Sequence, residues 1–436
     1  MPTGIIEIND AALRAGVDGG IAITSPGYAV MDGGRLLVGE EAIRNARLLP
    51  RWTNNRFWNQ LGTDPVPNGT ETVRHHADIA FAHLEQVWQH IREQAHQVIL
   101  AVPGFYTRAQ LGLLLGMARE CNMPVAGLVD TSLVSVCNVP AHQTILHLDI
   151  YLHRITLTVL RSDTLLRQVE SVTISETGLF TLWDRWANII ASQFIQTSRY
   201  DPMHQATSEQ QLYDRLPVWI EQLNGERSAT FELNTGSSRH QVAVSREQLL
   251  TACATIYPQI VQLIRDYTPG GEVVSLFVSH RFRGFPGLDD SLALLSDVDL
   301  VHLDEQSTFA GIAAFEEKIA SAGSSVSHVT SLPVTAKRPR PVVRQHERRA
   351  THVLIEDHAV AIGNALRLGT SEDGKVRPSG ESPRCTIYVR GKQTMLDNHT
   401  GKAVLLNDAP APEQAQLHPG DRLTIEDQTM TLISVG

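Results

Sequence analysis

Hydrophobic and polar positions follow two rhythms between the N-terminus and about residue 320. Short apolar runs typical of strands occur at residues 4–8, 20–24, 97–102, 124–130, 143–149, 153–160, 230–233, 240–244 and 273–278. Between them, apolar residues recur at helical spacing over residues 108–121, 178–196, 209–223 and 245–267. Strands that alternate with helices in this way predict a layered α/β domain.

The pattern changes after residue 320. Residues 321–327 are small and polar, and residues 337–350 carry six Lys or Arg against the single Glu347. Proline and charge together predict an extended linker over residues 321–350. The last part, residues 351–436, has only short strand-like runs, at 352–355, 365–368, 386–389, 403–406, 422–425 and 430–434. It predicts a small all-β sandwich.

Composition narrows the class of protein. A chain of 436 residues has room for several domains, and its net charge of −10 does not favour nucleic-acid binding. The sequence holds no uninterrupted apolar stretch of membrane-spanning length and no signal-peptide zones at its start. We therefore expect a cytoplasmic protein of bacterial type, without membrane insertion.

Cysteine and histidine spacing gives no metal signature. The four cysteines form no CxxC pair, which predicts reduced and mostly buried thiols. His76, His83 and His90 recur every seven residues in a helical stretch. Metal-binding helices usually present histidines four residues apart, so we expect a polar surface stripe and no metal site.

Three segments of the α/β part occur in a family-specific order. They are residues 25–58, 97–136 (QVILAVPGFYTRAQLGLLLGMARECNMPVAGLVDTSLVSV) and 302–315 (HLDEQSTFAGIAAF). Their order resembles the nucleotide-binding domain of DnaK-type heat-shock chaperones, within the actin-like superfamily. The resemblance implies that residues 1–320 form a two-lobed, ribonuclease H-like ATPase fold.

The expected phosphate-binding hairpins depart from this family. Actin-like ATPases use two glycine-rich hairpins, because glycine lets backbone N–H groups approach an anion closely. The first should lie near residues 8–13 (INDAAL) and the second at residues 149–154 (DIYLHR). Tyr151, Leu152 and His153 replace small residues in the second hairpin. We expect their side chains to occupy the space of the phosphates.

Other cleft positions are also altered. The adenosine motif should fall at residues 278–283, where His280 and Arg281 replace paired glycines. Arg56 stands at the position of the family's lysine, and it cannot titrate in the same way. The acids that remain are Asp10, Asp130 and Asp149. In an active enzyme such acids would hold magnesium and position water; otherwise they are structural carboxylates.

Residues 351–436 resemble a forkhead-associated domain, a β-sandwich whose loops read phosphothreonine peptides. The likeness lies in residues 366–371 (LRLGTS), 381–389 (ESPRCTIYV), 401–408 (GKAVLLND) and, most specifically, 417–435 (LHPGDRLTIEDQTMTLISV). The resemblance suggests as peptide-binding candidates Arg367, Thr370, Ser382, Arg384 and Asn407.

Several of these candidates depart from the phosphate-reading pattern. Phosphothreonine capture needs a cation and fixed donors at one rim, yet Thr370 stands at the position of the family's phosphate-binding Arg. Ser382 and Asn407 match a phosphate-contacting Ser and a loop Asn, and both could equally be turn residues. Arg367 or Arg384 could supply the missing cation. The pattern favours phospho-independent protein binding, with phosphopeptide binding as the alternative.

The sequence therefore predicts a non-catalytic scaffold. Its pseudo-ATPase body and its sandwich would bind protein partners without ATP, magnesium or another cofactor, and homo-oligomers are possible. The alternatives are a divergent ATPase that uses Asp10, Asp130 and Asp149 with ATP and magnesium, a filament-forming actin homologue, and a phosphothreonine-peptide reader.

Overall fold

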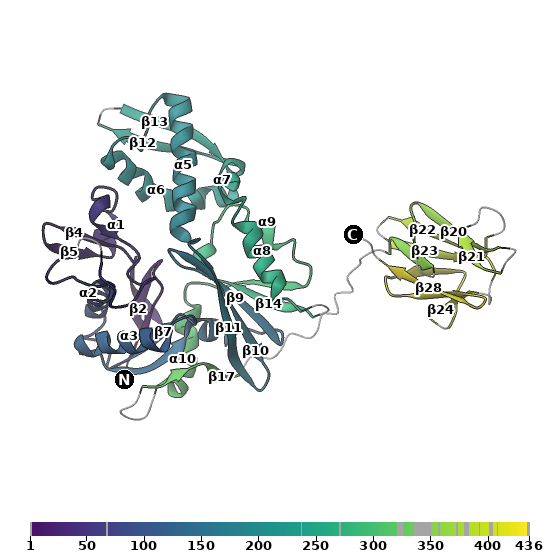
Figure 1. Cartoon of the computed structure of the whole chain (residues 1–436), viewed down its shortest axis with the longest axis horizontal. Coiled ribbons are helices and arrows are strands. Elements are labelled where there is room, and N and C mark those ends of the chain that lie inside the picture. The colour runs from purple at the N-terminus through teal and green to yellow at the C-terminus, as the bar shows by residue number, and fades with distance from the viewer. Residues whose placement is uncertain are drawn as a thin grey trace. The chain divides into compact units, whose positions relative to one another are not determined.

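The chain forms two compact units, Met1–Pro339 and Arg340–Gly436. In this computed structural model the described residues are 2–66, 69–236, 238–269, 272–320, 326–334, 350–355, 358–371, 374–378, 383–391, 393–400, 404–407 and 409–433. The first unit is mixed α/β and the second is all-β (Figure 1).

Two six-stranded sheets form the frame of the first unit. One consists of β1 (Thr3–Glu7), β2 (Leu13–Val17), β3 (Gly20–Ser25), β7 (Gln97–Val102), β8 (Val125–Asp130) and β16 (His328–Val329), in the order β16-β8-β7-β1-β2-β3. The other consists of β9 (Thr144–Ile150), β10 (Arg154–Ser162), β11 (Leu165–Ser175), β14 (Val274–Val278), β15 (Val298–His302) and β17 (Ser331–Pro333), in the order β15-β14-β9-β10-β11-β17.

The two sheets repeat one arrangement. In the first, β1, β2 and β3 form an antiparallel meander, β7 runs parallel to β1, and β8 runs parallel to β7. In the second, β9, β10 and β11 form the meander, while β14 and β15 continue in parallel from β9. The turn between the first two strands of each meander therefore lies at an equivalent place in the two sheets.

Helices and smaller sheets complete the first unit (Figure 1). The helices are α1 (Glu40–Ile43), α2 (His76–Gln89), α3 (Arg108–Glu120), α4 (Thr131–Val136), α5 (Leu179–Ser198), α6 (Ala206–Gly225), α7 (Arg246–Cys253), α8 (Tyr257–Asp266), α9 (Leu288–Leu292) and α10 (Ser307–Ile319), with short 3-10 turns η1 (Pro50–Trp52) and η2 (His280–Phe282). The small sheets are β4 (Ala29–Asp32), β5 (Arg35–Val38) and β6 (Thr53–Asn54), and the hairpin β12 (Ser228–Thr235) with β13 (Ser238–Ser245).

Helix α5 shows why these segments fold as they do. Leu182, Trp186, Ile190 and Phe194 follow one another at four-residue spacing, and all are fully buried. Such a stripe places one face of the helix in the core. The helix ends at Arg199, which adopts a left-handed conformation (φ 58°).

The region after β13 differs from the predicted single helix. Ser245 caps α7 as its sequence suggests: its hydroxyl accepts from the Gln248 N–H at 3.2 Å. However, the run over residues 245–267 is divided into α7 and α8, and Pro258 opens the second helix. Proline cannot donate an N–H, so it fits the first turn of a new helix better than the interior of a long one.

Residues 328–333 belong to the frame, although the sequence assigned them to the linker. β16 pairs with β8 and β17 pairs with β11, and Leu332 is buried in the core. Burial of this leucine favours pairing over an extended tether. All six Lys and Arg of the basic run at residues 337–350 lie in residues 335–349, which are outside the described residues.

The second unit holds two sheets around one core. The first consists of β18 (His352–Ile355), β19 (His358–Ala361), β24 (Val404–Leu406), β25 (Ala409–Pro410), β27 (Arg422–Ile425) and β28 (Gln428–Ile433). The second consists of β20 (Ala365–Thr370), β21 (Val376–Pro378), β22 (Cys385–Arg390), β23 (Gln393–Asn398) and β26 (Gln414–Leu417). Val353, Leu368, Ile387 and Leu423 come from both sheets and share the core.

Candidate functional site

The two turns that should grip phosphate contact each other directly. The first follows β1, and the second follows β9. The Asp10 carboxylate accepts a hydrogen bond from the backbone N–H of Leu152 at 2.7 Å. The Asn9 side-chain amide donates to Asp149 Oδ2 and to the carbonyl of Ile150, both at 3.2 Å. The side chains of Asn9 and Asp10 thus join the first turn to the second.

The side chains of the second turn fill the space around it. Tyr151 is buried and meets the ring of Phe105 edge-on, with 5.0 Å between ring centroids. Leu152 is fully buried beside Tyr28 and Val30. The turn after β9 is thus filled by the large side chains of Tyr151 and Leu152.

His153 is anchored as an uncharged side chain. Its Nε2 lies 3.1 Å from both the carbonyl oxygen and the side-chain oxygen of Asn55. Burial, reinforced by the charge of Arg56, lowers the pKa of His153 to about 4. The ring is therefore neutral at pH 7, and its Nε2 donates to Asn55.

Arg56 lies beside this turn but is engaged elsewhere. Its guanidinium binds the Glu176 carboxylate through both nitrogens, at 2.9 and 3.2 Å. The pair is largely exposed. The ion pair that the structure gives Arg56 is therefore with Glu176 and not with Asp10, Asp130 or Asp149.

The N-terminus of α5 is also occupied. The first N–H groups of a helix attract anions because they lack intrahelical partners. Here the N–H of Leu179 donates to the Tyr151 carbonyl at 2.9 Å, and the N–H of Phe180 donates to the Leu152 carbonyl at 3.0 Å. The second turn itself satisfies these donors.

A buried network of charges lies between the two sheets. Arg281 pairs with Glu7 at 3.2 Å and with Asp149 at 3.5 Å, and Arg14 Nε donates to Glu7 at 2.6 Å. Burial alone would raise the pKa of Glu7, but Arg281 and then Arg14 hold this pKa at about 2. Two carboxylates and two guanidiniums therefore neutralise one another inside the protein.

Little empty space remains in this network. A cavity of about 10 Å³ is bordered by Glu7, His147, Asp149, His280 and Arg281. This volume holds about one water molecule, whereas ligand sites usually measure roughly 300–1,000 Å³. A triphosphate with its metal ion cannot enter unless the network is rebuilt.

Two acids of the cleft have raised pKa values. Burial raises the pKa of Asp10 to about 6 against the opposing hydrogen bond from Leu152. Burial likewise raises the pKa of Asp130 to about 6. Asp130 caps α4, where its Oδ1 accepts from the Ser132 N–H at 2.8 Å, while its buried Oδ2 has no hydrogen-bond partner among the described residues.

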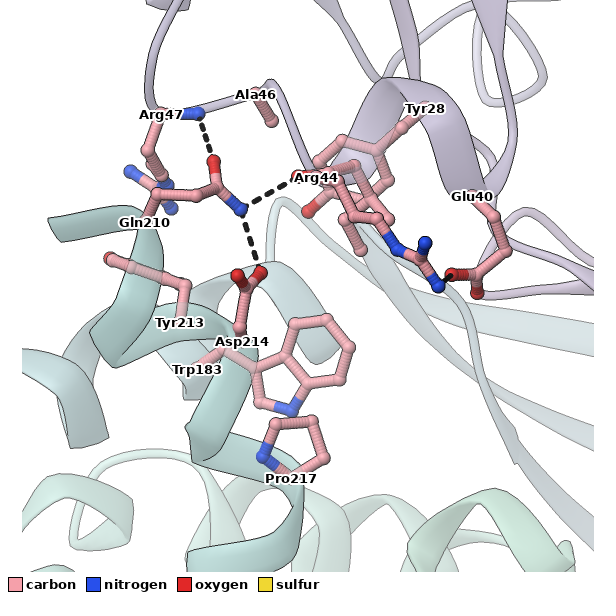
Figure 2. A pocket seen from close by; sticks show the side chains of 11 residues that line it. Tyr28, Glu40, Arg44, Ala46, Arg47, Trp183, Gln210, Tyr213, Asp214 and Pro217 are labelled. Atoms are coloured by element: carbon pink, nitrogen blue, oxygen red, sulfur yellow. Dashed lines mark hydrogen bonds and ion pairs between the residues drawn. The ribbon is translucent and has the colours of Figure 1, made fainter. Parts of the chain in front are cut away.

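Side chains of residues 43–47 and of α6 interact along one side of a pocket (Figure 2). The Gln210 side chain on α6 accepts from the Arg47 N–H at 2.8 Å and donates to the Ile43 carbonyl at 3.0 Å. Arg47 pairs with Glu209 at 3.2 Å, and its guanidinium lies 3.5 Å from the centroid of the Tyr213 ring. These contacts join residues 43–47 to α6.

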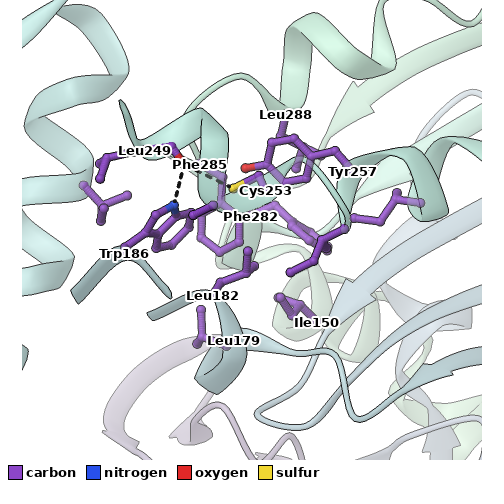
Figure 3. Packing of buried hydrophobic residues seen from close by; sticks show 14 of the residues in the cluster. Ile150, Leu179, Leu182, Trp186, Leu249, Cys253, Tyr257, Phe282, Phe285 and Leu288 are labelled. Atoms are coloured by element: carbon purple, nitrogen blue, oxygen red, sulfur yellow. Dashed lines mark hydrogen bonds between the residues drawn. The ribbon is translucent and has the colours of Figure 1, made fainter. Parts of the chain in front are cut away.

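The altered adenosine motif is anchored by aromatic packing. Phe282 and Phe285 enter the core beside Trp186, and the Phe285 and Trp186 rings meet edge-on at 5.2 Å (Figure 3). Burial, followed by the charges of Arg281 and Arg14, lowers the pKa of His280 to about 2. The segment therefore holds a neutral imidazole next to the guanidinium of the charge network.

Two residues of the charge network, Glu7 and Arg14, were not expected from the sequence, and Arg281 was expected only as a replacement for a family glycine. Together with Asp149 they form the network. A signal existed, because Glu7 and Arg14 are charged residues within otherwise apolar strands. A charge in such a position is rarely fully buried unless it has a partner.

The predicted histidine stripe is wrong for two of its three members. His76 and His83 are buried, and only His90 is exposed. Trp58 donates to His83 Nδ1 at 3.0 Å, so His83 Nε2 carries the hydrogen and donates to Ser25 Oγ at 2.8 Å. Burial lowers the pKa of His83 to about 3. His83 is thus a hydrogen-bonded core residue and cannot take a proton from Ser25.

The peptide-binding candidates of the second unit are partly engaged with their own neighbours. Thr370 donates to Glu426 at 3.2 Å, and Arg384 pairs with the same carboxylate at 3.1 Å. Asn407 bonds to Asp421 at 2.9 Å and adopts a positive φ, as turn residues do. Arg367 is exposed on β20, and Ser382 lies outside the described residues.

A comparison with protein-family models and with curated proteins finds no match for this chain. Within the described ranges, no group of three His, Cys, Asp or Glu side chains is placed to hold a metal ion. In the same part of the chain, no helix combines the length and apolar character needed to cross a membrane. The four cysteines are free thiols, and Cys121 alone is partly exposed.

Proposed function

We propose that this chain is a non-catalytic scaffold of actin-like, DnaK type. Its cleft is closed by its own residues, and it binds protein partners through its first unit and through a forkhead-associated-like second unit. Neither ATP nor magnesium is needed for this role. The proposal places the chain in the cytoplasm, where free cysteines remain reduced.

The repeated sheet supports the actin-like part of the proposal. The same meander with two added parallel strands occurs in both large sheets, and the equivalent turns of the two meanders face each other. This duplication is the arrangement that the order of sequence segments implies. Function still has to be argued from the site and not from the fold.

The contact between the two turns is the observation that supports a non-catalytic role. Asp10 and Leu152 are joined at 2.7 Å, and the cavity bordered by Glu7, Asp149 and Arg281 measures about 10 Å³. Opening this space would uncover the pairs of Arg281 with Glu7 and Asp149. Breaking buried pairs of this kind is costly, so the closed cleft is a stable state.

A scaffold should bind protein partners through both of its units, and this binding should not depend on a nucleotide. Two binding units on one chain raise the local concentration of one partner near the other. The full chain should capture the same proteins from the native cell with and without magnesium and ATP. Each unit expressed alone should capture some of these proteins. Release of the whole set by ATP would contradict the proposal.

One observation favours a divergent ATPase as the second candidate. Asp130 has a buried carboxylate oxygen without a hydrogen-bond partner in the described residues and a pKa raised to about 6, a combination typical of functional carboxylates. Phosphate release from magnesium-ATP above background, lost in Asp149→Ala, would support this candidate.

Phosphopeptide binding is a further candidate function, because two arginines of the second unit are accessible to a ligand. Arg367 on β20 and Arg384 beside β22 belong to the same sheet. The carboxylate of Glu426 already pairs with Arg384 and competes with a phosphate. Phosphothreonine peptides that bind more tightly to Glu426→Gln than to the wild type would favour this candidate.

A further inference from the structure

A pocket of about 370 Å³ opens between residues 28–47 and helices α5 and α6 (Figure 2). Its volume is within the usual range for small-molecule sites, roughly 300–1,000 Å³. None of the residues of the buried charge network lines it. The pocket is therefore separate from the closed cleft.

One of the charged side chains that line this pocket has no ionic partner among the described residues. Arg44 pairs with Glu40 at 3.6 Å, and Arg47 pairs with Glu209 at 3.2 Å. Asp214 receives only the neutral amide of Gln210, at 2.7 Å, and no cation in the described part of the chain pairs with it. The pocket thus presents one exposed carboxylate without a counter-ion.

Aromatic and carbonyl groups surround this carboxylate. Trp183 and Pro217 line the pocket directly below Asp214 (Figure 2). The Tyr213 ring is already covered by Arg47, whereas no ring or cation contact engages Trp183 within the described ranges. Pro217 lies inside α6 and has no N–H to give to the Tyr213 carbonyl, which leaves an acceptor beside the pocket.

We propose that this pocket binds a small organic cation, a guanidinium or ammonium group on a short apolar stem. Asp214 pairs with the charge and accepts its N–H groups. The indole of Trp183 attracts the same cation through its π face. Two sources share this chemistry: a free amine, and an Arg or Lys side chain of a partner protein.

Calorimetric titration of the full chain tests the proposal with two cationic probes. One is agmatine, a free alkylguanidinium, and the other is a short peptide, acetyl-Gly-Arg-Gly-amide. The neutral analogue butylurea has a similar planar head and no charge. We expect at least one cationic probe to bind at concentrations up to about 5 mM, and butylurea not to bind. Binding of agmatine but not of the peptide would identify a free amine as the ligand. Binding of the peptide but not of agmatine would identify an Arg or Lys side chain of a partner protein.

Two substitutions and a matched control assign the site. Asp214→Asn and Trp183→Phe should each weaken binding, by about tenfold for the lost charge. Asp266→Asn should leave it unchanged, because Asp266 is an exposed helical Asp that accepts from Gln262 at 2.7 Å, in the same geometry as Gln210 and Asp214. Absence of binding by both cationic probes, or equal affinity of wild type and Asp214→Asn, would overturn the proposal.

Discussion

Arg281 is the residue on which the closed cleft most depends. Its guanidinium pairs with Glu7 and with Asp149, and all three side chains are almost completely buried. Of the three acids that the resemblance implies for magnesium, Asp149 is thus already paired with a cation of the same protein. An internal cation of this kind makes a bound metal unnecessary for charge balance.

Arg281→Gln should therefore destabilise the first unit strongly. Loss of one partner from a buried ion pair costs about 3 kcal/mol or more, because the remaining charge stays buried. Arg35→Gln is the control: it removes an exposed arginine that binds Glu41, and should cost less than about 0.5 kcal/mol. Denaturant unfolding measures both. Equal effects would show that Arg281 is not the internal counter-ion.

Asp10 should give the protein a distinct pH dependence. Burial raises the pKa of Asp10 from 3.8 to about 6. Between pH 3.8 and about pH 6 the Asp10 carboxyl is therefore protonated in the folded state and ionised in the unfolded state. The contribution of Asp10 to the unfolding free energy consequently falls as pH rises through this window.

Asp10→Asn removes this titration and retains an oxygen that can accept from the Leu152 N–H. The stability of the variant relative to wild type should rise by up to about 3 kcal/mol between pH 4 and pH 7. Urea unfolding at several pH values measures the difference. A difference that does not vary with pH would contradict the raised pKa.

Residue types drew attention to the large side chains of the second turn but not to the charges that pair beside it. Tyr151 and His153 are conspicuous in the sequence because they replace small residues in an expected glycine loop. Glu7 and Arg281 form an ion pair although they lie far apart in the sequence. Hydrophobic periodicity carries no information about such a contact, because it depends on how the two sheets face each other.

Each of the two facing turns is held by a glycine at an equivalent position. Gly27 follows β3, and a Cβ there would lie 2.4 Å from the Asp10 carbonyl oxygen. Gly178 follows β11, and a Cβ there would lie 2.5 Å from the carbonyl oxygens of Tyr151 and Leu152. Only glycine allows the chain to pass so close to both turns.

Gly178→Ala should accordingly destabilise the first unit by about 2–3 kcal/mol, since backbone must shift to admit the methyl group. Gly112→Ala in α3 is the control: no atom lies within 4 Å of its Cβ position, and alanine should stabilise the exposed helix by about 0.5–1 kcal/mol. Thermal unfolding compares the two variants. Stabilisation by both would contradict the close packing of Gly178 on the second turn.

Long, regular elements could be predicted from the sequence better than short ones. The strand at residues 97–102 and the helix α5 stand out through continuous or four-residue apolar spacing. β16 and β17 are only two and three residues long. Their pairing is decided by the strands already in place, and so the local sequence resembles a linker.

At the scale of the whole chain, the two units should unfold separately. Each has its own core, and the chain divides between Pro339 and Arg340. Calorimetry of the full chain should show two transitions, and residues 340–436 expressed alone should reproduce one of them. A single cooperative transition, or an unfolded fragment, would contradict independent units.

Calorimetric titration of the full chain with magnesium-ATP tests the closed cleft most directly. We expect no heat of binding, because Asp10 bonds to Leu152 at 2.7 Å and the cavity bordered by Glu7, Asp149 and Arg281 measures only about 10 Å³. Binding at micromolar concentration that weakens in Asp149→Ala would contradict it, since the nucleotide would then occupy the space assigned to Tyr151 and Arg281.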